Sequence, residues 1–248
     1  MSLAGQKVVG GSALYGAPVG VLMLETRFPR IPGDMGNAGT WNFPVLYKIV
    51  RGASPDRVVL NGAVGTEESF ISAARELVSL GARGITTNCG FLSLFQEKLK
   101  AACGVPVATS SLMQAEVVQR LLPPGQRVGI ITISAATLSP AHLAAANVPA
   151  GTPVVGTEGL REFSRVILKD EPEMDVEACR LDLLDAATRL MDENPDVGAI
   201  VLECTNMSMH SAAIRRATKR PVFDMYNFVS WFHGALAPRN FIDQPILD

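Results

Sequence analysis

The sequence has few of the residues from which metal sites and disulfide frameworks are built. It contains three histidines in 248 residues, and neither a CxxC nor an HExxH motif is present. Because transition-metal sites depend on such clusters, we expect no metal site. The four cysteines, at positions 89, 103, 179 and 204, do not follow the spacing of a disulfide framework. We therefore expect reduced thiols and a cytoplasmic protein.

Neither charge nor hydropathy points to a polymer or a membrane as partner. The formal net charge is −2 and no cluster of Lys and Arg stands out, so we expect no nucleic-acid partner. The apolar runs are interrupted well before the roughly 20 residues that a membrane span needs. Residues 1–11 lack a charged region followed by an apolar core, so we expect no secretory signal. With 48% apolar and 19% charged residues, the composition indicates a soluble globular protein.

The chain contains an internal repeat. Residues 85–90 (ITTNCG) and 201–206 (VLECTN) both join a short apolar run to a polar turn that holds one cysteine. Each cysteine is followed 17 residues later by a Pro-Val pair. Matching segments lie 109 to 115 positions apart, close to half of the chain. This spacing indicates two similar halves with small insertions.

The first half begins with an apolar run. Residues 19–25 predict a strand that is buried on both faces of a parallel sheet. The run ends in residues 26–39, which are rich in Gly and Pro and therefore predict a long loop of functional interest. Residues 57–61 predict the next strand. Thr66, which precedes two Glu residues, predicts the N-cap of a helix that extends to about Leu80.

Strands and helices then alternate to the end of the chain, which predicts βαβ units and parallel sheets. We expect an α/β fold of two pseudo-symmetric flavodoxin-like half-domains with the active site in the cleft between them. The first half-domain is predicted to comprise residues 1–112 with 222–248 and to carry Cys89. The second is predicted to comprise residues 113–221 and to carry Cys204.

Both repeated cysteines are expected at the carboxyl end of a strand and just before a helix. Ligands bind at these strand ends in open parallel sheets. The N-terminal amides and dipole of a helix can hold an anion and can lower a thiol pKa from about 8.5 toward neutrality. The neighbouring side chains are hydrogen-bonding groups suited to a carboxylate or an amide, namely Thr87, Asn88, Thr205 and Asn206.

The alternative interpretation is that these cysteines are small buried hydrophobic residues, as most free cysteines are. Cys103 and Cys179 fit that interpretation, because each lies inside a helix-like segment without a polar motif. For Cys89 and Cys204 we favour a functional role, because they occupy equivalent positions of the repeat and each has Thr and Asn nearby.

Two facing thiols are suited to proton transfer at one carbon from opposite sides. One thiolate removes a proton α to a carboxylate, and the other thiol returns a proton to the opposite face. Two half-domains related by a pseudo-two-fold axis would present Cys89 and Cys204 in that manner. Such acid–base groups are expected to have pKa values tuned near the working pH. No electron-sink cofactor is indicated.

In its cysteine motifs the sequence resembles the aspartate/glutamate racemase superfamily, which includes hydantoin and allantoin racemases and maleate cis–trans isomerase. The resemblance rests on residues 87–90 (TNCG), on residues 203–206 (ECTN), and on the duplicated layout over nearly the whole chain. It implies two α/β half-domains with the active site between them, a homodimer, and catalysis without a cofactor by Cys89 and Cys204.

The resemblance also implies substrate-binding groups after the first strand of each half. These correspond to Glu25 and Thr26 in the first half and to residues 134–137 in the second, with Ser134 and Thr137 as the candidates. Together with the motif residues and one loop arginine, the expected substrate-binding set is Glu25, Thr26, Arg30, Thr87, Asn88, Gly90, Ser134, Thr137, Thr205 and Asn206.

Two motif positions differ from those of the amino-acid racemases. These enzymes usually have Asn-Thr directly after the first cysteine, whereas here Asn88 precedes Cys89 and Gly90 follows it. Glutamate racemases carry a histidine two places after the second cysteine, where this chain has Asn206. Both differences disfavour glutamate as the substrate.

Three other charged residues near these motifs have alternative interpretations. Arg27 and Arg30 lie in the Gly- and Pro-rich loop and could clamp a substrate carboxylate, but a solvated surface position is an equally good interpretation of either one. Glu203 adjoins Cys204, and alternation along a strand would point it away from the thiol, so we assign it to structure.

The sequence therefore predicts a cofactor-independent racemase or epimerase acting on a small amino-acid-like carboxylate or amide. The nearest alternative is a maleate-type cis–trans isomerase in which one cysteine adds covalently to the double bond. A third, of another class, is a non-catalytic protein that binds a small anion between its halves.

Overall fold

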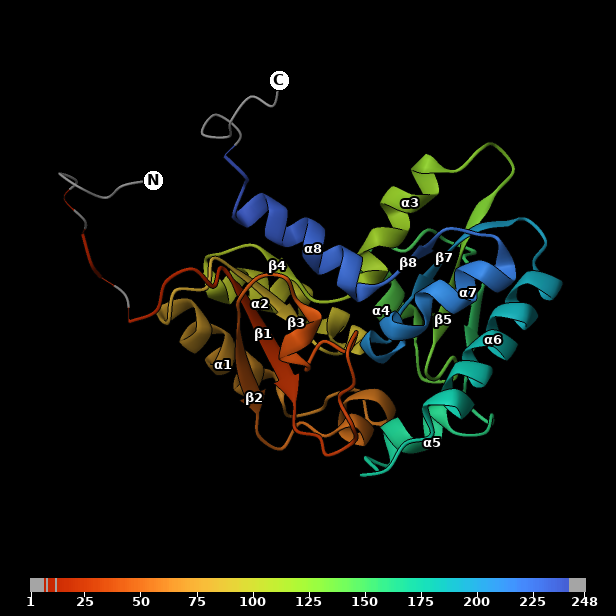
Figure 1. Ribbon diagram of the computed structural model, residues 1–248, viewed down its shortest axis with the longest axis horizontal. Helices are drawn as coiled ribbons and strands as arrows, with labels where there is room; N and C mark the ends of the chain where they lie inside the picture. The colour runs from red at the N-terminus through yellow and green to blue at the C-terminus, as the bar shows by residue number, and fades with distance from the viewer. Residues whose placement is uncertain (1–6, 8, 12, 241–248) are drawn as a thin grey trace, which may run out of the picture.

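The computed structural model describes residues 7, 9–11 and 13–240, which contain two four-stranded parallel sheets (Figure 1). The first has the strand order β2-β1-β3-β4 and the second β6-β5-β7-β8. The first sheet consists of β1 (Val19–Leu24), β2 (Val45–Val50), β3 (Gly84–Thr87) and β4 (Val107–Ala108). The second consists of β5 (Arg127–Thr132), β6 (Val154–Gly156), β7 (Val197–Leu202) and β8 (Val222–Phe223).

The two sheets have the same topology, because in each the first strand lies between the second and the third, and the fourth follows the third. All of these pairs are parallel. Strands β1, β3 and β7 are buried at every residue, as central strands are when helices cover both faces of a sheet. The predicted fold class, two pseudo-symmetric flavodoxin-like halves, is confirmed.

Most of the helices connect successive strands within one half, whereas α3 leads from the first sheet to the second and α8 follows the last strand. The α-helices are α1 (Glu67–Ser79), α2 (Gln96–Cys103), α3 (Ala115–Leu121), α4 (Pro140–Ala145), α5 (Phe163–Leu168), α6 (Val176–Glu193), α7 (Ser211–Thr218) and α8 (Met225–Leu236). Four short 3₁₀ helices accompany them, η1 (Ala38–Thr40), η3 (Gly90–Phe95), η4 (Ser111–Gln114) and η5 (Thr205–His210). A single π-helical turn, η2, spans Asp56–Leu60.

One predicted strand was wrong. Residues 57–61 were expected to form a strand, but Asp56–Leu60 is the π-helical turn η2, and the strand next to β1 is β2 (Val45–Val50). A short apolar run does not separate strand from helix by periodicity alone. Here Val58 and Val59 reach the core from one helical turn. Strand β2 was overlooked because it is an edge strand and only partly buried.

Helix α8 returns from the second half and packs on the first (Figure 1). Its side chains Met225, Phe228 and Phe232 share an apolar cluster with Val19 and Val21 of β1. Strand β8 pairs with β7 in the second sheet, two residues beyond the predicted boundary at residue 221. The chain therefore crosses back to the first half between β8 and α8. The exact boundaries of the two half-domains stay a prediction.

None of the helices in the described part of the chain is long and apolar enough to cross a membrane. The expectation that no secretory signal is present concerns residues 1–11, of which residues 1–6 and 8 lie outside those that the structure describes.

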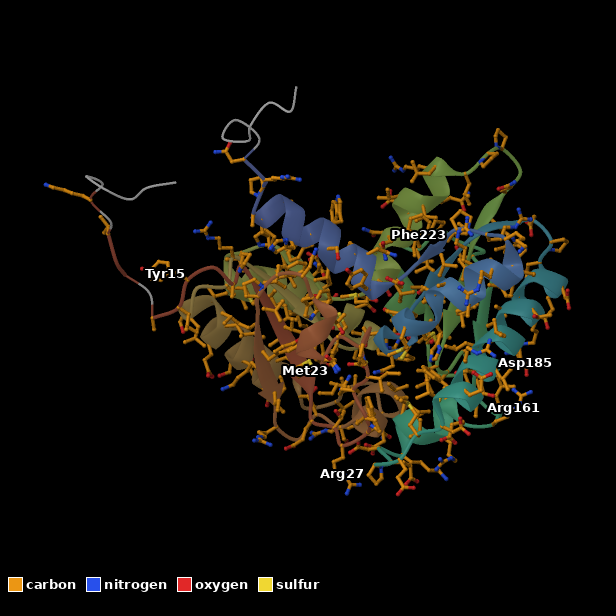
Figure 2. The ribbon with its side chains drawn as sticks, in the orientation of Figure 1. Tyr15, Met23, Arg27, Arg161, Asp185 and Phe223 are labelled. Carbon is orange, nitrogen blue, oxygen red and sulfur yellow. The ribbon has the colours of Figure 1, made fainter. Side chains whose placement is uncertain are left out.

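The Asp182 side chain of α6 holds the start of α5 in place through hydrogen bonds. Its fully buried carboxylate accepts hydrogen bonds from the backbone N–H groups of Arg161, Glu162 and Phe163 and from the Arg161 guanidinium. Burial raises the pKa of Asp182, but these hydrogen bonds outweigh burial and leave it below its ordinary value. Arg161 also pairs with Asp185, which lies beside it at the edge of the molecule (Figure 2).

We predict that Asp182→Asn lowers the free energy of unfolding by about 1–3 kcal/mol, because an amide cannot accept all of these hydrogen bonds. The stability that the Asp182 carboxylate contributes is present above about pH 4 and is lost as the pH falls further, since the pKa of Asp182 is depressed in the folded state. Urea unfolding of the variant and the wild type at neutral and acidic pH measures both effects. The control is Asp185→Asn, whose half-exposed ion pair with the same arginine is expected to contribute less than about 1 kcal/mol. Equal losses in both variants would contradict the prediction.

Candidate active site

The two repeated cysteines occupy equivalent places in the two halves. Cys89 follows β3 and is the N-cap residue of η3, and Cys204 follows β7 and is the N-cap residue of η5. Each 3₁₀ helix runs directly into an α-helix, α2 in the first half and α7 in the second. The sequence repeat is therefore a structural repeat in which a thiol lies at the carboxyl end of the third strand of each sheet.

Cys89 and Cys204 line one small cavity between the halves. Its volume is about 20 Å³, and the two cysteines are 8% and 7% exposed. A cavity of this size holds about one water molecule, so a carboxylic acid can enter only if the lining moves. The residues that line it are Leu24, Phe28, Pro55, Val59, Asn88, Cys89, Phe91, Ile133, Ile167, Glu203, Cys204 and Asn206.

The cysteine turns of the two halves are in direct contact. The Thr205 hydroxyl donates a 2.6 Å hydrogen bond to the backbone carbonyl of Asn88. Gly90 lies so close to Glu203 that a Cβ atom at position 90 would be 2.5 Å from the Glu203 carbonyl oxygen and closer still to its Oε1. The Asn88 side chain accepts a 2.7 Å hydrogen bond from the backbone N–H of Leu24. These contacts set how closely the two thiols approach.

The environment of the thiols opposes their ionisation. Backbone N–H groups of Phe91 and Leu92 are directed at Cys89, and that of Asn206 at Cys204, and each lowers the pKa of its thiol. Burial acts in the opposite direction and is the larger effect, and the nearby Glu203 carboxylate adds to it. The pKa of Cys89 is raised to about 12, and that of Cys204 well above its ordinary value. The expected shift of these pKa values toward neutrality is therefore wrong for the closed cavity.

Asn206 belongs to a chain of polar groups that starts in the loop after β1. Its side-chain oxygen accepts a 3.5 Å hydrogen bond from the Cys204 thiol, and its amide nitrogen donates to the buried Asp34 carboxylate. Asp34 in turn receives a 2.9 Å ion pair from Arg30, which also donates to the Thr26 hydroxyl at 2.8 Å. Arg30 and Thr26 thus support the side chain that contacts Cys204.

The other expected binding residues do not line the cavity. The Thr87 hydroxyl donates to the backbone carbonyl of Thr109 at 2.7 Å. Ser134 and Thr137 hydrogen-bond to each other at 2.9 Å. Glu25 pairs at 2.5 Å with Arg51 on the surface. Arg27, the second arginine of the loop, points outward and is 75% exposed (Figure 2).

Glu203 is the site residue that sequence reasoning missed. Strand β7 ends at Leu202, so alternation no longer governs the next residue, and Glu203 lines the cavity together with Cys89 and Cys204. Its Oε2 accepts a 2.7 Å hydrogen bond from Thr132, whereas its Oε1 has no hydrogen-bond partner among the described residues. Burial raises the pKa of Glu203 to about 7 and outweighs the hydrogen bonds from Thr132 and from the backbone N–H of Ile133, which lower it. A charged residue directly after a wholly apolar strand was the available signal.

Cys103 and Cys179 lie in α2 and α6, outside this cavity, and both are buried. In the part of the chain that the structure describes, no group of three or more His, Cys, Asp or Glu side chains could hold a metal ion.

Comparison with known proteins found a family match over part of the chain. Residues 111–228 match the model of the family described as Asp/Glu/Hydantoin racemase. Among solved structures, a cysteine-substituted mutant of arylmalonate decarboxylase in a sulfate-associated form is similar, with a TM-score of 0.60 and 19% identity over 89% of this chain and 93% of that chain. A glutamate racemase of Bacillus anthracis has a TM-score of 0.56 and 12% identity over 90% of this chain and 85% of that chain.

The family match over residues 111–228 and the shared fold agree with the resemblance to the aspartate/glutamate racemase superfamily that the cysteine motifs predicted. Among proteins of known function, a dimethylsulfoniopropionate lyase of Durusdinium sp. clade D is 28% identical over 238 residues, which are 92% of this chain and 76% of that protein. Dimethylsulfoniopropionate lyase 7 of Emiliania huxleyi is 26% identical over 88% of this chain and 67% of its own. These relatives are lyases, so the reaction is not given by the superfamily's name.

We predict that Gly90→Ala separates the two cysteine turns. The added methyl group would collide with the Glu203 backbone, which cannot move aside as a flexible side chain can. The expected result is a loss of about 1–3 kcal/mol in the free energy of unfolding and faster labelling of Cys89 and Cys204 by a thiol reagent. Urea unfolding and mass spectrometry of the labelled protein measure these two effects.

The matched control is Gly234→Ala in α8, where a Cβ atom has no neighbour within 4 Å. Because alanine has the higher helix propensity, this control should be neutral or slightly stabilising. If Gly90→Ala behaves like Gly234→Ala in both measurements, the close approach of the turns is not what holds the site together.

Proposed function

We propose that the protein is a cofactor-independent enzyme that removes a proton from the carbon α to a carboxylate, with Cys89 and Cys204 as the acid–base pair. The observation that supports this proposal is that one thiol from each half lines the same small cavity, at equivalent strand ends. A thiolate on one side and a thiol on the other are suited to remove a proton and to supply one.

The reaction we favour is a β-elimination of the dimethylsulfoniopropionate lyase kind, because the relatives found by sequence that cover 92% and 88% of this chain carry that name. A cysteine thiolate takes the proton from C2, the C–H electron pair forms the C2–C3 double bond, and the C3–S bond breaks with its electrons on sulfur. The products are acrylate and dimethyl sulfide, and the proton left on the thiol returns to solvent. One thiolate is sufficient for this step.

Racemisation is the second candidate, and the symmetric placement of the thiols supports it. In that reaction Cys89 and Cys204 act on opposite faces of one carbon, and no bond other than C–H is broken. Asn88 and Asn206, which line the cavity, are proposed to hold the substrate together with the backbone N–H groups at the starts of η3 and η5. A homodimer and a cytoplasmic location, both expected from the sequence, stay predictions.

Incubation in D₂O, followed by NMR, tests the proposal. The substrate panel contains dimethylsulfoniopropionate, α-chiral amino acids, hydantoins and maleate. We predict that wild type converts or exchanges one compound. If the reaction is a racemisation, Cys89→Ser and Cys204→Ser each lower the rate by about 100-fold or more, since a serine hydroxyl is a far weaker acid–base group. If it is an elimination, the variant that lacks the proton-removing thiolate shows this loss. Cys103→Ser, a buried cysteine outside the cavity, is the control and should retain the rate.

The products identify the reaction. Acrylate indicates elimination, and deuterium at an inverted stereocentre indicates racemisation. Fumarate formed from maleate with a covalent adduct on one cysteine would indicate the cis–trans isomerase instead. Turnover that survives both cysteine substitutions would contradict the two-thiol proposal, and binding without turnover of any compound in the panel would support a binding protein.

A further inference from the structure

The cavity contains one acceptor that the fold does not use. Glu203 is 0% exposed, and its Oε1 has no hydrogen-bond partner among the described residues, whereas Oε2 is held by Thr132. A buried carboxyl oxygen without a partner is costly in free energy. Because Glu203 lines the cavity that the two thiols share, a ligand bound there can satisfy this oxygen.

The charges around the cavity favour a positively charged ligand. Its described lining residues include a carboxyl group and two thiols but no Lys, Arg or His. Arg30 is nearby but is already paired with Asp34 and Thr26. A dicarboxylate would therefore bring two further negative charges to Glu203 without a free cation to balance them, which is unfavourable in a site that excludes water.

The walls favour alkylated cations over ammonium groups. An ammonium group brings three N–H donors, each of which needs an acceptor when it is buried. A sulfonium or a quaternary ammonium ion brings methyl groups, which can pack against apolar and aromatic side chains. Phe28 and Phe91 line the cavity together with aliphatic side chains, and Glu203 Oε1 is a single free acceptor.

We propose that the Glu203 carboxylate binds the alkylated onium group of a zwitterionic carboxylate substrate and thereby makes the enzyme select such compounds over dicarboxylates. The inference rests on the proposed function in that it takes the cavity as the substrate site. It adds to that function the residue that determines specificity for the onium group, of which the sulfonium of dimethylsulfoniopropionate is one example.

Binding of an onium group beside Glu203 would also favour ionisation of the two thiols. The Glu203 carboxylate is one cause of the high pKa values of Cys89 and Cys204. A cation beside Glu203 cancels that repulsion and lowers the pKa of both thiols. The substrate's own charge thus favours formation of the thiolate that removes its proton.

Three ligands that share a propanoate chain and differ in the group at its far end test the proposal by calorimetric binding at pH 8. 3-(Trimethylammonio)propanoate has an onium group with a poor leaving group, 4,4-dimethylpentanoate replaces its nitrogen by carbon, and succinate is a dicarboxylate. We predict that wild type binds the onium compound at least tenfold more tightly than either of the others. Glu203→Gln, which keeps the size of the side chain and its contact with Thr132, should lose that preference while its affinity for 4,4-dimethylpentanoate stays within about threefold.

Glu177→Gln is the matched control, because it removes the same charge from the exposed face of α6 and should leave all affinities unchanged. Equal binding of the onium compound to wild type and Glu203→Gln overturns the proposal, and so does tighter binding of succinate than of the onium compound by wild type. Circular dichroism establishes whether Glu203→Gln is folded.

The pH dependence of wild type provides a test that needs no variant. Glu203 has a pKa of about 7, and a cation prefers its ionised form, so affinity for the onium compound should rise as the pH increases from 6 to 8. Affinity for 4,4-dimethylpentanoate should stay level or fall. The groups that face Glu203 are the thiols of Cys89 and Cys204, with Arg30 and Asp34 beyond them, and neither thiol titrates in this range. A level profile for the onium compound overturns the proposal.

Failure of this inference is distinguishable from failure of the proposed function. One outcome is cysteine-dependent exchange in D₂O with an amino acid, together with onium binding that is the same in wild type and Glu203→Gln. It would support the two-cysteine enzyme and contradict the role of Glu203 in binding an onium group. Glu203-dependent onium binding without any cysteine-dependent turnover would support the role of Glu203 and contradict the two-cysteine enzyme.

Discussion

The close approach of the two cysteine turns is the constraint on which the rest of the site depends. The backbone at Gly90 contacts the backbone and side chain of Glu203, and Thr205 donates to the carbonyl of Asn88. Because no side chain fits between the turns, the thiols of the two halves line one cavity instead of two separate pockets. The small size of that cavity and the burial of the groups that line it follow from this contact.

A closed cavity of this kind penalises every negative charge. The pKa values of Cys89, Cys204 and Glu203 are all raised, and burial is the largest cause in each case. The site therefore keeps the two thiols in their neutral forms until a ligand changes the electrostatics. Racemases and a decarboxylase share the fold, so the fold alone does not select a reaction. On the proposed function, the side chains that line the cavity between the halves make that selection.

Prediction from sequence succeeded where a pattern was local or repeated. The duplicated layout located both cysteines at strand ends, because a strand, a polar turn and a helix start each have short sequence signals. It failed at residues 57–61, where an apolar run formed a helical turn, and at Glu203, where a strand ended one residue before the charge. In both places, packing against another segment decided the outcome.

The sequence by itself determined the two α/β halves, the parallel sheets and the equivalent positions of Cys89 and Cys204, because these depend on hydrophobic periodicity and on an internal repeat. Only the tertiary structure decided that both thiols share a cavity with Glu203 and that Arg30 supports Asp34. Those relations join residues far apart in the chain, and their energies depend on burial. Burial is a property of the packed molecule, so no local pattern of residues encodes it.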